Sequence, residues 1–231
     1  MRTAFVTGSS AGIGKAIAAR LLDEGWCVEG FDIAAPAIAH GRFRSHALDL
    51  GDDGAIAESI RAALGAGAPQ ALVHAAGVLR IAPLGALQHQ DGALMWQVNV
   101  AAAAGIANLV LPAMCAAGQG RAVLIGSRVS KGVARRSQYA ATKAALVALA
   151  RSWAIETVES GVTVNVISPA ATDTGMLTDP ARSSTAPRMP PIGRFIQPAE
   201  IAALTVFLLS PEAAAITGQD IAICGGASLT Y

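Results

Sequence analysis

The first 25 residues combine a buried-strand pattern, a glycine-rich turn and an amphipathic helix, and this order restricts the fold more than any other stretch. Residues 3–7 (TAFVT) are continuously apolar or β-branched, and residues 15–25 (KAIAARLLDEG) alternate at helical spacing and end in glycine. Gly8, Gly12 and Gly14 lie between them. Such glycines let the backbone approach a pyrophosphate, and a helix N-terminus supplies free N–H groups and partial positive charge. The stretch predicts a dinucleotide-binding α/β sheet.

The next strand (WCVEGFD) strengthens this prediction because it ends in a carboxylate. Asp32 lies eighteen residues after Gly14, where it can accept hydrogen bonds from the ribose hydroxyls on the adenine side of a dinucleotide. The same charge would repel a 2′-phosphate. Lys15 and Arg42 are the only basic residues near enough to offset it, and Lys15 is expected to point to solvent. The predicted cofactor is therefore NAD.

Strand and helix patterns alternate along the rest of the chain, which predicts one α/β domain over residues 1–231 with a doubly wound parallel sheet of about seven strands and helices on both faces. The segment from Asp32 to Phe43 is too short for a complete crossover helix, so a helical turn or a loop is expected there. Further strands are expected at 43–49, 70–74, 121–126, 162–167 and 219–224, and helices at 52–65, 91–116, 139–160 and 198–209.

The proline-rich stretch at about 170–197 interrupts this alternation. It is too long for an ordinary connection between a strand and a helix, and long loops of this kind usually carry function. We expect it to form a substrate lid over the ends of the strands.

Composition and charge argue against several classes of partner. The net charge of +1 predicts no attraction to nucleic acid or to a membrane surface. The three cysteines lie far apart in apolar surroundings, which favours free thiols in a reducing cytoplasm, and no charged leader precedes the first motif. No metal-ligand spacing is evident, so no metal is expected.

Residues 92–120 contain no charged side chain, and two interpretations apply to them. A membrane span is one, but Gln97, Asn99, Asn108 and Pro112 interrupt the apolar run and no basic residues flank it closely. A helix buried between the sheet and a partner subunit is the interpretation that we favour.

Three side chains with acid/base chemistry follow the fifth predicted strand. Tyr139 and Lys143 are four residues apart at the start of an Ala-rich helix, so they share one face about 6 Å of rise apart. An ammonium close to a phenol lowers the phenol pKa and suits it to general acid/base catalysis. Ser127 lies twelve residues earlier, at a strand end, where it could hydrogen-bond a carbonyl or alcohol oxygen. Alone, a Tyr and a Lys at this spacing are more often a solvated helix face.

The order of these motifs resembles that of the short-chain dehydrogenase/reductase family over essentially the whole chain. The matching features are Thr7-Gly8-x3-Gly12-Ile13-Gly14, Asp49 after a strand, a degenerate Asn-Asn-Ala-Gly at His74–Gly77, Asn99, Ser127, Tyr139-x3-Lys143 and Ser168-Pro169. The resemblance implies hydride transfer between a nicotinamide and an alcohol or carbonyl. It also implies that Ser127 holds the substrate oxygen, Tyr139 moves the proton and Lys143 binds the nicotinamide ribose. Asn99 would kink its helix and hold a water that links Lys143 to solvent.

The same resemblance implies a set of residues that contact the cofactor. They are Gly8, Ser10, Gly12, Ile13, Gly14, Asp32, Asp49, Leu50, Ala75, Ala76, Gly77, Tyr139, Lys143, Pro169, Thr172 and Thr174. Ala11 occupies a turn position where NADP-dependent relatives often carry a basic residue, which adds to the prediction of NAD.

The chain departs from the family pattern at three places. Ala170 replaces the usual glycine, which restricts the backbone without necessarily blocking the cofactor. His74 and Ala75 replace two asparagines, so the hydrogen bonds that brace the sheet must be lost or rerouted. Ser127 lies one residue closer to Tyr139 than is common, which implies a tighter loop. None of these changes removes a catalytic group.

The substrate is the least constrained prediction. Arg80 and Arg128 each follow a predicted strand end and are candidates to bind a substrate carboxylate, while Arg182 and Arg188 lie in the predicted lid. The segments Ala75–Arg80 and Ser168–Thr174 resemble those of 2,3-dihydro-2,3-dihydroxybenzoate dehydrogenases. That resemblance implies a small hydroxy acid or cyclic-diol acid. The alternative is that these arginines are solvated or packing residues.

The combined prediction is an NAD-dependent oxidoreductase of a small alcohol or ketone, with Tyr139 as general acid/base. A 3-oxoacyl-type carbonyl reductase and a non-catalytic dinucleotide-binding sensor or scaffold remain as alternatives. Relatives pair through two long helices, which implies a homodimer or a homotetramer.

Overall fold

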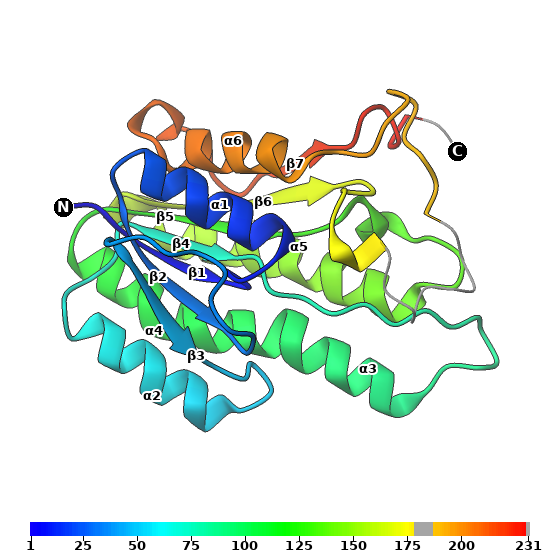
Figure 1. Ribbon diagram of the computed structural model, residues 1–231, viewed down its shortest axis with the longest axis horizontal. Coiled ribbons are helices and arrows are strands. Elements are labelled where there is room, and N and C mark those ends of the chain that lie inside the picture. Colours follow the sequence, from blue (N-terminus) through cyan, green and yellow to red (C-terminus); the bar gives the residue numbers. More distant parts are fainter. Residues whose placement is uncertain (178–186, 230–231) are drawn as a thin grey trace.

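Seven parallel strands form one sheet in residues 1–177 and 187–229, the part of the chain that the computed structural model describes. The strand order is β3-β2-β1-β4-β5-β6-β7, so the chain starts in the middle of the sheet and winds outward in both directions (Figure 1). The strands are β1 (Thr3–Thr7), β2 (Cys27–Asp32), β3 (Phe43–Ala47), β4 (Ala71–His74), β5 (Gly120–Ile125), β6 (Val162–Pro169) and β7 (Asp220–Ile223). The prediction of a doubly wound α/β sheet is confirmed.

The winding direction reverses at β1, which pairs with β2 on one side and with β4 on the other. In open parallel sheets the carboxyl ends of the strands on either side of such a reversal leave a crevice that binds ligands. The glycine turn after β1 and the Ala75–Gly77 segment after β4 lie at this point.

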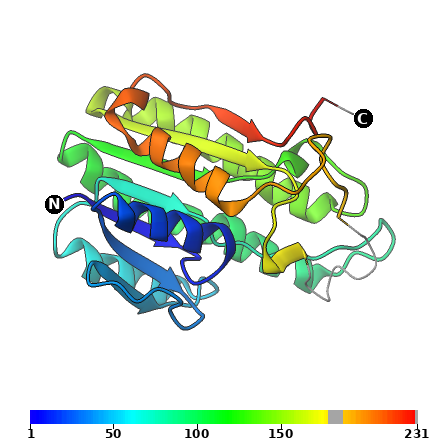
Figure 2. The ribbon, with the colours of Figure 1, turned by 45° about the horizontal axis from the view of Figure 1, so that its top comes forward.

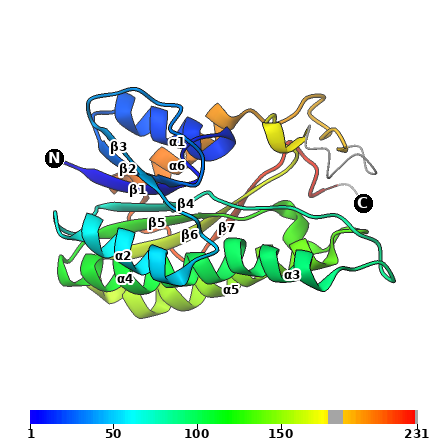
Figure 3. The same ribbon diagram turned by 60° about the horizontal axis from the view of Figure 1, so that its bottom comes forward.

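Helices cover both faces of the sheet, as Figure 3 shows. Helices α1 (Gly12–Asp23) and α6 (Pro198–Leu209) lie side by side on one face (Figure 2), and α2 (Asp53–Leu64), α4 (Ala102–Ala116) and α5 (Ser137–Thr157) cover the other. Each face has its own cluster of buried apolar side chains, and β-branched residues of the strands contribute to both clusters. The strands are therefore apolar on both sides, which is typical of a parallel sheet between two helix layers.

The single helix predicted over 91–116 is interrupted. Helix α3 (His89–Trp96) passes into a π-helical turn, η1 (Gln97–Ala101), and only then into α4. By length and mean hydropathy (1.7), His89–Ala116 is the only stretch of the described residues apolar enough to cross a membrane. Half of its most apolar window is buried inside the fold.

Several predicted boundaries shift by one to three residues in the structure. Strand β3 ends at Ala47 rather than residue 49, because the Asp49 carboxylate accepts a hydrogen bond from the Gly51 amide (2.8 Å) and turns the chain towards α2. The segment between β2 and β3 is a loop, one of the two forms expected for it. Helix α5 ends at Thr157, and the 3₁₀ turn η3 (Val158–Ser160) completes the segment that was predicted as helix.

Candidate active site

The glycine turn after β1 adopts backbone that side chains would prevent. Gly8 and Gly12 have positive φ angles of 68° and 50°, in the left-handed region that favours glycine. A Cβ on Gly14 would lie 2.1 Å from the Gly8 carbonyl oxygen. The first turn of α1 can therefore pack directly against the end of β1, as a dinucleotide cradle requires.

The start of α1 fits a bound anion. Ala11 precedes the helix and provides no side-chain cap, and the first turn has no acidic residue. The orphan N–H groups of that turn thus have no side-chain partner at the cap and carry the positive end of the helix dipole. Gly12 and Gly14 of this turn line a cavity of about 900 Å³. These features fit the pyrophosphate of a dinucleotide.

Asp32 shapes the turn from the end of β2. One carboxylate oxygen accepts from the Ser10 amide and the other from the Ala34 amide, both at 2.9 Å. Asp32 lines the cavity, so its oxygens retain lone pairs for a ribose hydroxyl. The structure places Ser10 behind this carboxylate rather than in the cavity lining, with its hydroxyl on the Ala34 carbonyl (3.2 Å).

The hydrogen bonds expected from the missing asparagines are rerouted through Thr7 and His74. The Thr7 hydroxyl oxygen accepts from the amides of Ala75 (3.1 Å) and Ala76 (3.2 Å). Its hydrogen is then available for His74 Nδ1, which lies 3.1 Å away. Burial, and secondarily the charge of Lys143, lower the pKa of His74 to about 3. A neutral imidazole therefore joins β1 and β4 behind the cradle.

Tyr139 and Lys143 come from the first two turns of α5 and are both buried, with 8% and 4% of their surface exposed. The ammonium lies 5.8 Å from the centre of the Tyr139 ring and donates to the Ile125 carbonyl at the end of β5 (2.8 Å). Burial lowers the pKa of Lys143 to about 8, so most of it is still charged at neutral pH. The side chain is fixed, yet two of its three N–H donors remain for a ligand.

Ser127 lies directly beyond β5 and caps the 3₁₀ turn η2 (Arg128–Lys131). Its Oγ accepts from the Val129 amide (3.2 Å), so its own hydrogen can be donated to a substrate oxygen. The tighter loop expected before Tyr139 contains η2 and a left-handed Arg135 (φ 66°).

Asn99 lies in the π-helical turn, fully buried, and braces the site without lining the cavity. Its Oδ1 accepts from the Val78 amide (2.8 Å), and its Nδ2 donates to the Val78 carbonyl (3.0 Å) and to Thr142 Oγ1 (3.0 Å). The break in the helix that was expected at this residue is present. The side chain ties the loop after β4 to Thr142 of α5, and the Thr142 hydroxyl in turn donates to the Tyr139 carbonyl (2.8 Å).

The cavity brings together most of the predicted site residues. Its lining includes Gly8, Gly12, Ile13, Gly14, Asp32, Asp49, Leu50, Ala75, Ala76, Gly77, Ser127, Arg128, Tyr139, Lys143, Pro169, Thr172 and Thr174. The glycine cradle and the candidate acid/base group thus face one space.

Arg80 is not part of that space. Its guanidinium lies 3.7 Å from the Asp91 carboxylate of α3 and donates to the Leu79 carbonyl (3.1 Å). The carboxylate-binding role predicted for Arg80 therefore loses its geometric basis, because the residue is absent from the cavity lining and faces an acidic partner. Arg128 keeps its place in the lining.

Several residues that line the cavity near Tyr139 and Ser127 belong to none of the sequence motifs: Leu94, Val133, Arg136, Met176, Leu177 and Pro187. For Arg136 a signal existed, because it lies three residues before Tyr139 and so on the same side of the helix start. The others come from loops and helix ends whose position depends on tertiary packing.

The predicted lid (residues 170–197) is described at both ends, and residues 178–186, including Arg182, lie outside the described range. Its two ends meet. Thr172 pairs with Ile196 in an isolated bridge, the Asp173 amide donates to the Ile196 carbonyl (2.9 Å), and the Ile196 amide donates to the Ala171 carbonyl (3.0 Å).

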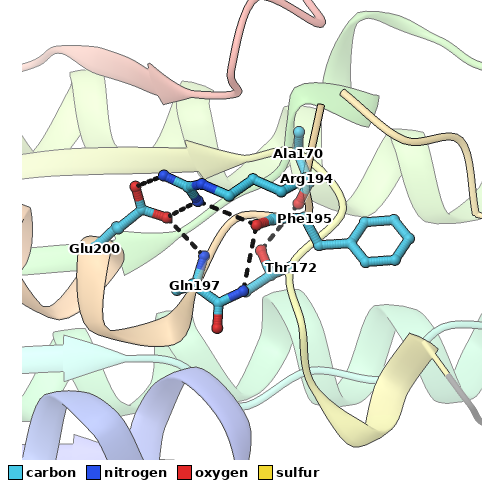
Figure 4. A network of polar contacts seen from close by, with 6 residues as sticks. All are labelled: Ala170, Thr172, Arg194, Phe195, Gln197 and Glu200. Carbon is cyan, nitrogen blue, oxygen red and sulfur yellow. Dashed lines mark hydrogen bonds and ion pairs between the residues drawn. The ribbon is translucent and has the colours of Figure 1, made fainter. Parts of the chain in front are cut away.

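A charged pair fixes the second end of this lid to α6 (Figure 4). Arg194 donates to both carboxylate oxygens of Glu200, at 2.7 and 2.8 Å, and the Gln197 amide donates to the same carboxylate (2.8 Å). The hydrogen bonds from Arg194, followed by that from Gln197, lower the pKa of Glu200 to about 2. The pair therefore stays charged throughout the physiological pH range.

Proteins of similar sequence include reductases and dehydrogenases. A family model described as enoyl-(acyl carrier protein) reductase matches residues 8–228. The 3-oxoacyl-[acyl-carrier-protein] reductase FabG of Vibrio cholerae is 35% identical over 97% of the chain and 96% of its own length. D-threitol dehydrogenase of Mycolicibacterium smegmatis is 34% identical over 97% of the chain and 92% of its own length. The chain belongs to the short-chain dehydrogenase/reductase family of oxidoreductases.

Solved structures show the same fold. Ligand-free aldohexose dehydrogenase of Thermoplasma acidophilum has a TM-score of 0.92 at 25% identity and covers 100% of this chain and 95% of its own. A variant of actinorhodin polyketide ketoreductase with NADPH has a TM-score of 0.87 at 26% identity, with 99% and 98% covered. The family prediction is confirmed, whereas the local resemblance to dihydrodihydroxybenzoate dehydrogenases gains no support from these relatives.

Proposed function

We propose that the protein transfers a hydride between NAD and a small secondary alcohol or ketone, with Tyr139 as general acid/base. The observation that carries this proposal is that Ser127, Tyr139 and Lys143 line the same cavity as the glycine cradle. A sensor or scaffold would need the cradle but not a buried Tyr and Lys beside it. These two residues therefore favour an enzyme over a sensor or scaffold.

Each residue of the site has a separate role in the proposed reaction. The nicotinamide, when bound, supplies or accepts the hydride. Ser127 donates its hydroxyl hydrogen to the substrate oxygen and holds it towards Tyr139, which gives or takes the proton there. Lys143 places a positive charge near the phenol and favours the phenolate, and its remaining N–H donors suit the ribose of the nicotinamide. Asn99 braces the site through its hydrogen bonds to Val78 and Thr142.

The choice of NAD rests on charge at the adenosine end. Asp32 and Asp49 are the charged residues that line this end, and no basic residue of the described chain joins them in the lining. A 2′-phosphate beside Asp32 would meet repulsion of about 1 to 4 kcal/mol at 4 Å. The NADPH in the ketoreductase structure argues for the opposite choice, so the two cofactors must be compared directly.

The cofactor prediction is tested with NADH and NADPH on a panel of ketones, followed by nicotinamide absorbance. We expect kcat/KM to favour NADH at least tenfold, and Asp32→Ala to remove most of this preference because the repelling charge is gone. Asp23→Asn, an exposed change at the end of α1, is the matched control. A wild-type preference for NADPH would contradict this role of Asp32, while turnover of no ketone or alcohol with either cofactor would contradict the proposed activity.

A second candidate is reduction of 3-oxoacyl thioesters. It is favoured by the 35% identity to an enzyme named for that reaction and by the apolar side chains, such as Leu94, Met176 and Leu177, around the catalytic end of the cavity. Higher kcat/KM on a 3-oxoacyl thioester than on any simple ketone would select this candidate over the first.

We also propose that the protein works as a homodimer or homotetramer in the cytoplasm. Helices α3 and α5 leave large apolar side chains exposed, among them Trp96 (51%) and Ile155 (78%), and apolar surface of this kind is often covered by a partner subunit. The three cysteines are free thiols, which suits a reducing compartment. Light scattering should give two or four times the chain mass of 23.3 kDa. A species of 23.3 kDa at micromolar concentration would exclude the proposed assembly.

A further inference from the structure

A second, smaller cavity of about 200 Å³ adjoins the catalytic end of the main one. Four residues line both cavities: Arg128, Ala170, Ala171 and Arg188. The rest of its wall is apolar and includes Met189 and Pro191. A ligand in the main cavity can therefore extend between the two arginines into a small apolar recess.

The two arginines reach this junction from distant parts of the chain. Arg128 directly follows Ser127 beyond β5, and Arg188 belongs to the lid. Within residues 1–177 and 187–229 neither guanidinium makes an ion pair or a hydrogen bond. Other arginines of the same chain do pair with carboxylates, as Arg80 does with Asp91 and Arg194 with Glu200.

The charges that line the main cavity are separated along its length. Asp32 and Asp49 lie at the adenosine end, whereas Arg128, Arg136, Lys143 and Arg188 line the catalytic end, where no carboxylate of the described residues joins them. Positive charges beside a concave apolar wall attract an anion, and a guanidinium can bind its oxygens with two parallel hydrogen bonds. The pyrophosphate of the cofactor already has its own site at α1.

We propose that Arg128 and Arg188 bind an anionic group of the substrate itself, a carboxylate or a phosphate. This inference rests on the proposed function and names its substrate class. The recess holds the volume of about six or seven water molecules, which suits one anionic group and a few carbon atoms. Because Ser127 and Arg128 line the same cavity, one small molecule can place its reacting oxygen at Ser127 and its anionic group at Arg128. The substrate is thus a small oxo acid or hydroxy acid, or the corresponding phosphate ester.

The test compares ketones that differ only in charge. Reduction of 4-oxopentanoate and 3-oxocyclohexanecarboxylate is measured against their methyl esters, and dihydroxyacetone phosphate against dihydroxyacetone. We expect kcat/KM for the charged member to exceed that of its neutral partner about ten- to a hundredfold, as the loss of a charged hydrogen bond implies. The pair with the larger ratio separates carboxylate from phosphate as the preferred group.

The variants Arg128→Gln and Arg188→Gln should each reduce that ratio towards one, because the loss falls on the charged ketone. Arg151→Gln is the matched control, because Arg151 is exposed on α5 and lines neither cavity. Equal rates on charged and neutral ketones in the wild type, or a preference that survives in both variants, would overturn the inference while leaving the proposed oxidoreductase intact.

Binding measurements cover the remaining case, in which none of the ketones is reduced. Isothermal titration of the NAD-bound protein with 3-oxocyclohexanecarboxylate and its methyl ester then tests the anion site alone. Tighter binding of the acid that is lost in Arg128→Gln supports the site although the proposed reaction has failed. Equal binding of acid and ester, with equal binding of dihydroxyacetone and its phosphate, overturns it.

Discussion

Replacing Tyr139 by Phe should lower kcat by about 10² to 10⁴-fold, the usual cost of losing a general acid/base. The substitution removes one hydroxyl from a buried ring and leaves the contacts of Lys143 with the Ile125 carbonyl in place. Binding of the dinucleotide, measured by fluorescence titration, and the thermal unfolding midpoint should therefore stay close to those of the wild type.

Ser137→Ala is a suitable control for this variant. Ser137 is the first residue of α5, exposed and two residues before Tyr139, so the change alters the same helix start without touching the cavity. Turnover of the Phe variant within tenfold of the wild type would remove Tyr139 from the proposed mechanism. Loss of dinucleotide binding in that variant would show that the tyrosine has a structural role instead.

The second large effect is expected from Gly14→Ala. The added Cβ would lie 2.1 Å from the Gly8 oxygen and 2.7 Å from its carbonyl carbon, so the turn or the helix must move. Overpacking of this kind costs about 1 to 3 kcal/mol of unfolding free energy. Because Gly8 and Gly12 form the cradle, we also expect dinucleotide affinity to fall by more than tenfold, roughly 1.4 kcal/mol.

Gly41→Ala makes the same chemical change at a position with no heavy atom within 4 Å of the new Cβ. Its unfolding free energy, from urea denaturation, and its dinucleotide affinity should match those of the wild type. If Gly14→Ala also bound the dinucleotide normally, the close contact between α1 and the end of β1 would not be a requirement of the cradle.

The order of strands and helices was predictable because each buried strand is a short apolar run bounded by turn residues. The glycine turn was equally clear, since only glycine tolerates the backbone at Gly8 and Gly12. The candidate acid/base group followed from Tyr139 and Lys143 at helical spacing, although its significance depended on the whole series of motifs.

Other features depend on contacts between segments that local sequence cannot reveal. Asn99 interrupts its helix through hydrogen bonds to Val78 and Thr142, which lie 21 residues before it and 43 residues after it. Arg80 lies outside the cavity lining because its guanidinium faces Asp91 of α3. Local patterns fix neither contact.

The small cavity lined by Arg128 and Arg188 could not be predicted from the sequence for the same reason. Arg128 could be placed at a strand end from the sequence, but its companion comes from the lid, sixty residues further on. Proline-rich loops have no periodic pattern from which a side-chain position follows. Their geometry becomes known only when the contacts at their ends are seen.

The two ends of the predicted lid are joined, so its length can vary without moving the residues that flank it. Since Thr172 and Ile196 are paired and Arg194 is anchored to Glu200, the chain between them leaves and returns at one fixed place beside the cofactor cradle. Closing a longer loop between fixed ends costs only about 0.6 kcal/mol for each doubling of its length. Insertions and deletions inside the lid can therefore be tolerated without displacing Thr172 or Thr174, so specificity can evolve, or be engineered, separately from hydride transfer.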